Sequence, residues 1–474
     1  MFPLSLAPVR PFICKQVFSI MIELSIYMYL KKKLLCYNKN IQFQLTAMIL
    51  CFSTNEKEVA STSVEQSPED LEGYVYGELV VLGYNGSLGN GMDKGRRRNK
   101  LLLKRRSKPS GVKPSVKHEV KNPQQCDLIK NTSKHSVSYT LNRHRAVVVQ
   151  YDHDEKTDMF QIGRSSEPQI DLIVMDTIRG DERSKSKTVT QSTISRFACR
   201  ILIEREPPFK ARIYAAGFDI SRNIFLGEKA TKWQTETDID GLTTNGILIM
   251  HPSKIPGRTS VWREVSVGGG IYALRESRST PQKSSLIPGE DNVLQDGTLI
   301  DLCGATLLWR SSAGLYNSPS RRELESRVAE MNAGRPQCPV GLNTLVFPTK
   351  ANVNSIDGER TPHVYMTCGH VHGQHSWEAE GDGKERRTCP MCRTTGPFEK
   401  LQLGIETTFY VDNEPPTHCF YPCAHMASEN TVKYWSSIPI PHGCHAFQAV
   451  CPFCATPVNS ETGYIRLIFQ DHVD

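Results

Sequence analysis

A cysteine- and histidine-rich pattern that occurs twice near the carboxyl end constrains the fold most. The first copy reads CGH and then CPMC, and the second reads CAH and then CPFC. Within a copy, 18 residues separate the two parts in the first case and 25 in the second. Each copy offers three thiolates and one imidazole, a donor set that tetrahedral Zn²⁺ accepts. We therefore predict two structural Zn²⁺ ions, with the ligands Cys368, His370, Cys389, Cys392, Cys423, His425, Cys451 and Cys454.

Cysteine usage favours a metal site over a disulfide framework. Nine of the 15 cysteines lie after residue 337, and no convincing secretory signal precedes them. The built-in histidines disfavour an iron–sulfur cluster. Four protein ligands per ion leave no open coordination position, so we expect a structural and not a hydrolytic role. Spacing leaves two pairings open, a sequential one and an interleaved cross-brace. Seven further side chains are expected not to be ligands: Cys338, Cys419, Cys444, His372, His418, His442 and His445.

A small two-zinc module that ends in Cys-Pro-x-Cys resembles the RING domain of ubiquitin ligases. Such a module forms no covalent intermediate. It docks a ubiquitin-charged conjugating enzyme (E2) and favours attack on the thioester by a lysine. Trp435, Pro452 and Phe453 are our candidates for the apolar docking patch. The alternative for Trp435 and Phe453 is that both belong to the hydrophobic core.

The region before the cysteines reads as β structure. Short apolar segments such as Met159–Ile162, Phe197–Ile203 and Thr298–Trp309 alternate with glycine- and asparagine-containing turns. Many short strands with such punctuation indicate an all-β sandwich. The stretch Arg321–Ala333 instead carries apolar residues at helical spacing and is followed by Gly334. We expect this helix, within a linker over residues 316–335, to separate the two domains.

The positive net charge of +7 is local and does not describe the whole chain. Nine lysines and arginines lie between Lys94 and Lys108, and the rest of the chain carries a net charge of −2. A global nucleic-acid-binding face is therefore not supported, and we interpret the run 94–108 as a solvated basic loop. A zinc protein that binds nucleic acid through this run is a weaker alternative.

Three polar clusters lie at the ends of predicted strands in the β region. They read Gly163-Arg164-Ser165, Ser195-Arg196 and Thr244-Asn245-Gly246, in that order. This order resembles the forkhead-associated (FHA) domain, which binds phosphothreonine. An arginine gives planar, permanently charged donors for phosphate, a serine adds a short donor, and an amide can hold the main chain of the ligand. The residues concerned are Arg164, Ser195, Arg196, Thr244 and Asn245. Family members usually carry a histidine where this chain has Ala198, which puts the loop geometry in question.

Longer strings of this chain resemble the Pellino family of E3 ubiquitin ligases. They include MFQIGRSSEPQIDLIVMDT, QSTISRFACRI, DGLTTNG, LIDLCGATLLWR, CGHVHG, CPMCR and YWSSIPIPHG. The resemblance implies an FHA core with an inserted wing, here expected from residues 176–194 and 205–240. It also implies the eight metal ligands and five phosphothreonine contacts named above. The implied partner is a phosphorylated, receptor-associated kinase of the Pelle type in Toll and interleukin-1 receptor signalling.

We thus expect a mainly β protein. An FHA-like β-sandwich with a wing spans residues 72–315, and a small two-zinc RING-like α+β module spans residues 336–474. The expected function is that of a cytoplasmic E3 ligase with no specific nucleic acid, and the alternative is a non-catalytic phosphopeptide-binding scaffold of the same pathway. Residues 1–60 hold two apolar runs, each shorter than a membrane-spanning helix requires. We expect them to form an atypical, unstructured extension, with a membrane anchor or a buried helix as alternatives.

Overall fold

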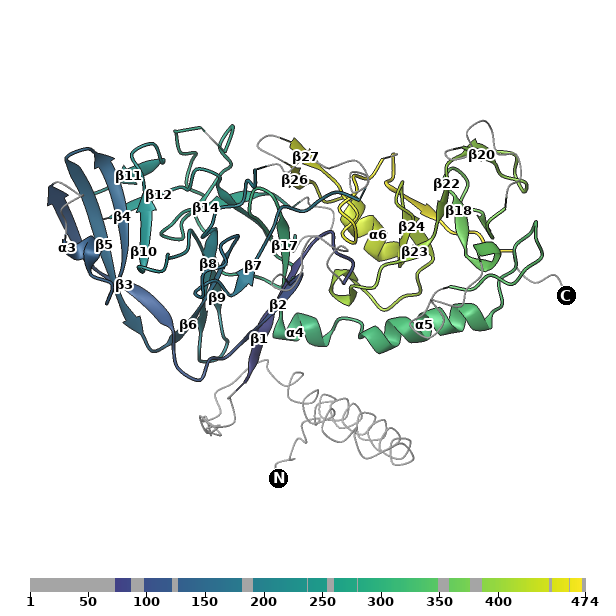
Figure 1. The fold of residues 1–474 in the computed structure, drawn as a ribbon, viewed down its shortest axis with the longest axis horizontal. Helices are drawn as coiled ribbons and strands as arrows, with labels where there is room; N and C mark the ends of the chain where they lie inside the picture. Colours follow the sequence, from purple (N-terminus) through teal and green to yellow (C-terminus); the bar gives the residue numbers. More distant parts are fainter. Residues whose placement is uncertain are drawn as a thin grey trace, which may run out of the picture. The chain divides into compact units, whose positions relative to one another are not determined.

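The chain is built mainly of β-strands in the computed structural model (Figure 1). The residues that the structure describes are 73–86, 98–121, 127–180, 191–236, 238–253, 260–278, 280–347, 358–375, 386–442, 446–459 and 461–470. The N-terminal extension expected over residues 1–60 lies outside them. Within these ranges no helix has both the length and the apolar character needed to cross a membrane.

Two sheets form the first domain. The larger has the order β15-β14-β13-β16-β17-β1-β2 and the smaller has the order β7-β6-β8-β9. Side chains from both sheets, such as Ile249 and Ile201, belong to one buried cluster, so the sheets share a core. This confirms the expected sandwich. The strands of the larger sheet are β1 (Val75–Val81), β2 (Lys100–Lys104), β13 (Ile247–Met250), β14 (Arg263–Val265), β15 (Ile271–Tyr272), β16 (Leu299–Asp301) and β17 (Thr306–Ser311). Those of the smaller sheet are β6 (Thr157–Gly163), β7 (Leu172–Ile173), β8 (Cys199–Glu204) and β9 (Ala211–Ala215).

A further sheet, of order β10-β4-β5-β3, extends the sandwich. It is built mainly from residues 111–154, whereas we expected the wing from residues 176–194 and 205–240. From those ranges only β10 joins this sheet, by pairing in parallel with β4. Residues 181–190 lie outside the described ranges. The elements here are β3 (Gly111–Lys121), α3 (Asp127–Lys130), β4 (His135–Asn142), β5 (Arg145–Asp154) and β10 (Asn223–Leu226), and a separate hairpin consists of β11 (Lys232–Gln234) and β12 (Ile239–Gly241).

Part of the basic run that we expected to be a solvated loop over residues 94–108 is a strand. Its residues Lys100–Lys104 are strand β2, which pairs with β1 in antiparallel register. Three consecutive leucines between two lysines give an edge strand that buries Leu103 completely and leaves Lys104 exposed. The expectation was wrong because charge counting overlooked the leucine run. Residues 94–97 lie outside the described ranges.

Two helices follow the sandwich, α4 (Ser312–Tyr316) and α5 (Arg321–Ala333). The bounds of α5 agree with the helix predicted from spacing. Ser320 and Glu323 form a capping box at its start, and Leu324 and Val328 are its buried residues. Figure 1 shows α5 running below the cysteine-rich domain.

Within its described residues, the cysteine-rich domain contains short strands, two short 3₁₀ helices and one α-helix of two turns. Its sheets have the orders β19-β18-β22, β20-β21, β23-β25-β24-β28 and β26-β27. The helix α6 (Glu429–Ser436) buries Val432 and Trp435. The remaining bounds are η3 (Gly358–Arg360), β18 (His363–Tyr365), β19 (Val371–His372), β20 (Arg387–Thr388), β21 (Thr395–Gly396), β22 (Phe398–Lys400), β23 (Gln402–Leu403), η4 (Thr407–Phe409), β24 (His418–Phe420), β25 (His425–Ala427), β26 (Ile440–His442), β27 (Ala446–Gln448) and β28 (Tyr464–Arg466).

One apolar cluster joins the two domains. It contains Val80, Leu248 and Leu308 from the sandwich together with Trp435 and Phe453 from the cysteine-rich domain. Each of these side chains is less than a tenth exposed. Burial of this kind contributes roughly 25 cal/mol for each Å² of apolar surface removed from water, so the two domains stabilise each other.

Candidate phosphate-binding loops and metal centres

The three predicted polar clusters come together at one end of the sandwich. Arg164 directly follows β6, and Ser195 lies shortly before β8, the strand that pairs with β6. The backbone N–H of Arg164 donates to the carbonyl oxygen of Ser195 at 3.2 Å, and that of Ser165 donates to Arg196 at 3.1 Å. The first two loops are therefore hydrogen-bonded directly to each other.

The third loop is tied to the second by a side chain. The Nδ2 atom of Asn245 donates to the carbonyl oxygen of Thr193 at 2.5 Å. We expected this amide to hold the main chain of a ligand, and part of its donor capacity is used inside the protein. Arg278 supports the same loop by donating from Nη1 to the carbonyl oxygen of Asn245 at 3.0 Å. All three loops are thus fixed relative to one another before a ligand binds.

The side chains at this end leave a positive, accessible surface. Arg164, Arg196 and Thr244 are exposed, while Ser195 and Asn245 are half-buried. The Nε atom of Arg164 donates to the carbonyl oxygen of Ile194 at 2.7 Å, and its Nη atoms have no partner within the described part of the chain. This leaves the end of the guanidinium group able to form a bidentate contact with a dianionic phosphate.

Two groups that support the loops were not predicted from the sequence. Asp176 accepts hydrogen bonds from the backbone N–H of Thr193 at 3.1 Å and from its hydroxyl at 2.9 Å. Arg278 is buried and forms an ion pair with the buried carboxylate of Asp301. Asp176 and Thr193 lie in the stretch 176–194 that we expected to belong to the wing, and no motif marked them. Ala198, where the family usually has histidine, is 1% exposed and lies in the core.

The eight predicted metal ligands form two separate groups. Cys368, His370, Cys389 and Cys392 form one, and the corresponding residues of the second copy of the pattern form the other. In each group the potential ligand atoms all lie within 4.8 Å of one another. The pairing is therefore sequential, and the cross-brace alternative does not apply. The second group consists of Cys423, His425, Cys451 and Cys454.

Tight turns bring the ligands of each group together. After Cys389 the backbone N–H of Arg393 donates to the carbonyl oxygen of Cys389 at 2.7 Å, and Ala455 donates in the same way to Cys451 at 2.8 Å. Gly369 and Ala424, between the cysteine and histidine of each Cys-x-His pair, both have positive φ angles, of 81° and 55°. The backbone of the two copies thus has the same kind of turn and a left-handed residue at corresponding positions.

In each group one cysteine has a lowered pKa, whereas burial raises the pKa of the other thiols. Hydrogen bonds from the thiols of Cys423 and Cys451 hold the pKa of Cys454 well below its ordinary value. In the first group, burial raises the pKa of Cys392, but hydrogen bonds from Thr394 and the neighbouring thiols outweigh it and lower that pKa overall. Each group therefore stabilises a thiolate. The buried Nδ1 atom of His425 has no hydrogen-bond partner among the described residues, as an atom that binds a metal would not. Both groups fit a Cys₃His zinc site.

The three E2-docking candidates are all buried in the folded chain. Trp435 is 1% exposed, and its indole N–H donates to the carbonyl oxygen of Phe409 at 2.8 Å. Phe453 is fully buried and packs on Phe409 and on the ring of His425. The prediction of these two as an exposed patch was wrong, and the core alternative applies. Pro452 is also buried, but partly by the other domain.

The described side chains among those expected not to be ligands lie outside both groups. Cys338 and Cys419 are buried within one apolar cluster of the cysteine-rich domain. His372 comes nearest to a ligand, with Nε2 at 3.8 Å from the sulfur of Cys389. Cys444 and His445 lie outside the described ranges.

Comparisons with known proteins agree with this arrangement. The family description "Pellino, FHA domain" matches residues 66–327, and "Pellino, RING domain" matches residues 331–474. The chain is 59% identical over 403 residues to "Protein pellino" of Drosophila melanogaster, which covers 84% of this chain and 94% of the relative.

Two vertebrate relatives show similar likeness. The chain is 54% identical over 415 residues to "E3 ubiquitin-protein ligase pellino homolog 2" of Homo sapiens, covering 86% of this chain and 98% of the relative. It is 51% identical over 424 residues to "E3 ubiquitin-protein ligase pellino homolog 3" of Mus musculus, covering 88% and 94%.

Proposed function

This chain belongs to the Pellino family of E3 ubiquitin ligases, and we propose that it acts in the cytoplasm as an E3 ligase that binds a phosphorylated kinase. The FHA domain selects a Pelle-type, receptor-associated kinase that carries phosphothreonine. The RING domain recruits a ubiquitin-charged E2. The pathway is Toll and interleukin-1 receptor signalling in innate immunity.

The arrangement of the three FHA loops carries the phosphothreonine part of the proposal. Arg164 supplies bidentate donors, and Ser195 lies next to it through the hydrogen bond between the two loops. Arg196 and Thr244 provide supporting contacts, and the donor of Asn245 that Thr193 does not use is available to the main chain of the ligand. A dianionic phosphate in such a place gains several charge-assisted hydrogen bonds.

The two Cys/His groups support the RING part. We propose that each holds one Zn²⁺, since each offers three thiolates, one imidazole and a tight-turn geometry. The ions would supply structural cross-links only, because all four coordination positions are filled by protein. The ligands build the loops on which a conjugating enzyme docks, and Pro452 is the remaining docking candidate from the sequence.

A reconstituted reaction tests the proposal. Full-length protein is incubated with activating enzyme, a panel of purified conjugating enzymes, ubiquitin and the kinase domain, with and without threonine phosphorylation. We expect chains that depend on an E2, and kinase capture that depends on Arg164. If Cys392→Ala produces as much product as the intact protein with every E2, the RING-dependent function is rejected.

One observation favours the scaffold as a second candidate. Pro452 is covered within the folded chain, and its carbonyl oxygen accepts a hydrogen bond from Gly83 of the FHA domain at 2.7 Å. A scaffold needs no accessible E2 surface. It predicts phosphopeptide binding that is lost in Arg164→Ala and no retention of any conjugating enzyme in a pull-down.

A further inference from the structure

We propose that the loop that follows β1, residues Leu82–Gly86, is a latch that covers the E2-docking face of the RING domain and thereby restrains ligase activity. The docking face is defined here as residues Leu403–Glu406 together with Pro452. The inference rests on the proposed function, because it assigns E2 docking to this second zinc loop.

The two segments of the docking face form one surface. A Cβ atom placed on Gly404 would lie 2.3 Å from the ring of Phe453, so the strip that contains Gly404 lies directly on the zinc loop. The ring of Phe453 also contacts Tyr410. Phe453 thus belongs to the interior of the RING domain, and Pro452 and the strip Leu403–Glu406 form the side that faces the latch.

Asn85 binds the strip in two directions. Its Nδ2 atom donates to the carbonyl oxygen of Leu403 at 3.0 Å, and its Oδ1 atom accepts from the backbone N–H of Ile405 at 2.6 Å. The amide therefore pairs with the strip as a neighbouring β-strand would. Gly83 adds the hydrogen bond to Pro452. Three backbone groups of this face, on Leu403, Ile405 and Pro452, are therefore already hydrogen-bonded within the chain.

The latch has a backbone shape that suits this contact. Asn85 has a φ of 35° and Gly86 a φ of 81°, both in the left-handed region. Asparagine and glycine adopt this region at low cost, and an Asn-Gly pair is a common turn former. The sequence Asn85-Gly86 therefore presents the amide without backbone strain.

An ion pair fixes the same edge. The Nζ atom of Lys100, on β2, lies 3.5 Å from a carboxylate oxygen of Glu406 and 3.5 Å from one of Glu78. Glu406 is only 3% exposed, whereas Lys100 remains 42% exposed at its side chain. Neutralising Lys100 would leave two buried carboxylates without their cation, which disfavours the closed arrangement.

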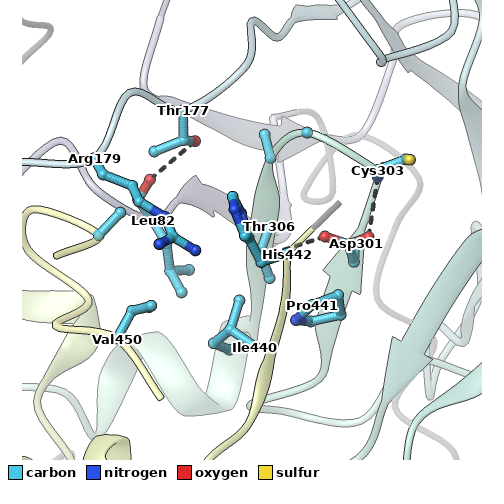
Figure 2. Close-up of a pocket in the computed structure, with 13 residues that line it drawn as sticks. Leu82, Thr177, Arg179, Asp301, Cys303, Thr306, Ile440, Pro441, His442 and Val450 are labelled. Carbon is cyan, nitrogen blue, oxygen red and sulfur yellow. Dashed lines mark hydrogen bonds between the residues drawn. The ribbon is translucent and has the colours of Figure 1, made fainter. Parts of the chain in front are cut away.

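Next to the latch the domains pack imperfectly. A cavity of about 80 Å³ lies here. Figure 2 shows Leu82, Thr177 and Arg179 of the FHA domain and Ile440 and Val450 of the RING domain around it. Incomplete packing forfeits dispersion contacts, so this edge is held less firmly than the apolar cluster beneath it. The latch can therefore open while the domains stay joined.

The test compares the full-length protein with the double variant Asn85→Gly/Lys100→Ser. Glycine removes both amide hydrogen bonds and tolerates the positive φ, and serine removes the cation. The matched control is Asn142→Gly/Lys134→Ser, at the sheet β10-β4-β5-β3. There, Asn142 caps a turn, and Lys134 forms an exposed ion pair with Asp152. The readout is the single-turnover discharge of ubiquitin to free lysine from each of a panel of purified, charged conjugating enzymes.

We expect the latch variant to discharge the thioester about three- to tenfold faster than the wild type, and the control variant to match the wild type. Hydrogen exchange at the Ile405 amide should rise in the latch variant alone. Lys100→Ser by itself, a change at an exposed side chain, should give a smaller increase in the same direction. Bound zinc and melting temperature are measured for every variant.

Equal discharge by wild type and by both latch variants, with unchanged zinc content, would overturn the latch while leaving the proposed function intact. The same holds if Met391→Asp, in the exposed first zinc loop, abolishes discharge and the latch variants do not alter it. No discharge by any form with any E2 would reject the proposed function, and the latch with it.

Discussion

Arg164 is anchored through one nitrogen and accessible through the others, which is the arrangement that a phosphate-binding arginine needs. We predict that Arg164→Ala lowers the affinity for phosphothreonine peptides by at least about tenfold, since a charged hydrogen bond contributes about 1.5–3 kcal/mol. Arg164→Lys should lose most of this affinity as well, because lysine cannot form the bidentate contact. Titration with a phosphothreonine peptide library and its unphosphorylated counterpart measures the effect.

The control for this prediction is Arg145→Ala. Arg145 is also exposed, but it lies on β5 and forms an ion pair with Glu119 on β3, outside the three loops. If both variants lose affinity equally, phosphate binding depends on overall charge and not on the position of Arg164.

His135 gives the stability of the protein a dependence on pH. Burial, together with the positive charges of Arg222 and Arg200, lowers the pKa of His135 from 6.5 to about 4. Between these two values the unfolded chain binds more protons than the folded one. Titration of His135 therefore leaves the free energy of unfolding unchanged above about pH 6.5 and lowers it as the pH decreases toward 4. We predict that His135→Gln reduces this loss, measured as the difference between urea midpoints at about pH 7.5 and about pH 5. An unchanged difference would show that other groups dominate the acid sensitivity.

At the scale of elements, the end of β6 determines whether the first two phosphate-binding loops can meet. A Cβ atom on Gly163 would lie 2.0 Å from the carbonyl oxygen of Arg196, so the loops approach as closely as they do only because this residue is glycine. We predict that Gly163→Ala costs about 1–3 kcal/mol in the free energy of unfolding and weakens phosphopeptide binding. Denaturant unfolding and peptide titration measure the two effects.

Gly227 provides the matched control. It has no atom within 4 Å of an added Cβ and no positive φ. Gly227→Ala should therefore leave both stability and phosphopeptide binding close to those of the wild type. Equal losses in the two variants would mean that the close approach at Gly163 is not the cause.

Elements with a strong local signal could be predicted from the sequence. The helix Arg321–Ala333 had helical spacing and a glycine stop, and the two zinc groups were set by Cys-x-His and Cys-x-x-Cys spacing. Strand β2 was missed because its three leucines are flanked by basic residues, and its role depends on β1, which lies about 20 residues earlier. The pairing of zinc ligands could not be predicted because it depends on how the two copies of the pattern fold in space.

At the scale of the whole molecule, the contact between the domains is the feature that no local sequence pattern predicted. Trp435 is an aromatic residue on a two-turn helix, and sequence alone left it equally suited to a docking surface and to a core. Its burial decides for the core, because Trp435 belongs to one apolar cluster with Val80 and Leu308 of the sandwich. The RING domain is therefore stabilised partly by its neighbour and not by its zinc ligands alone.

The two Cys/His groups are coupled to the rest of the chain to different degrees. Cys451 and Cys454 belong to the apolar cluster shared with the sandwich, and the carbonyl oxygen of Cys454 accepts a hydrogen bond from Gly180 at 2.9 Å. Cys392, in the first group, is exposed. Structural zinc in small domains contributes roughly 10 kcal/mol of folding free energy. Loss of either ion should therefore unfold the lobe that holds it, but the consequences for the FHA domain should differ.

We predict that Cys392→Ala disorders the part of the RING domain around the first Cys/His group. Phosphopeptide binding should stay within about twofold of the wild type, because changes at distant sites have nearly independent effects. Cys451→Ala should instead lower the melting temperature of the FHA domain as well, since it removes a ligand beside the shared cluster. Zinc content, peptide titration and hydrogen exchange across β1 and β17 distinguish the two variants. If Cys451→Ala leaves the exchange of these strands unchanged, the shared cluster does not stabilise the sandwich, and the two domains fold independently.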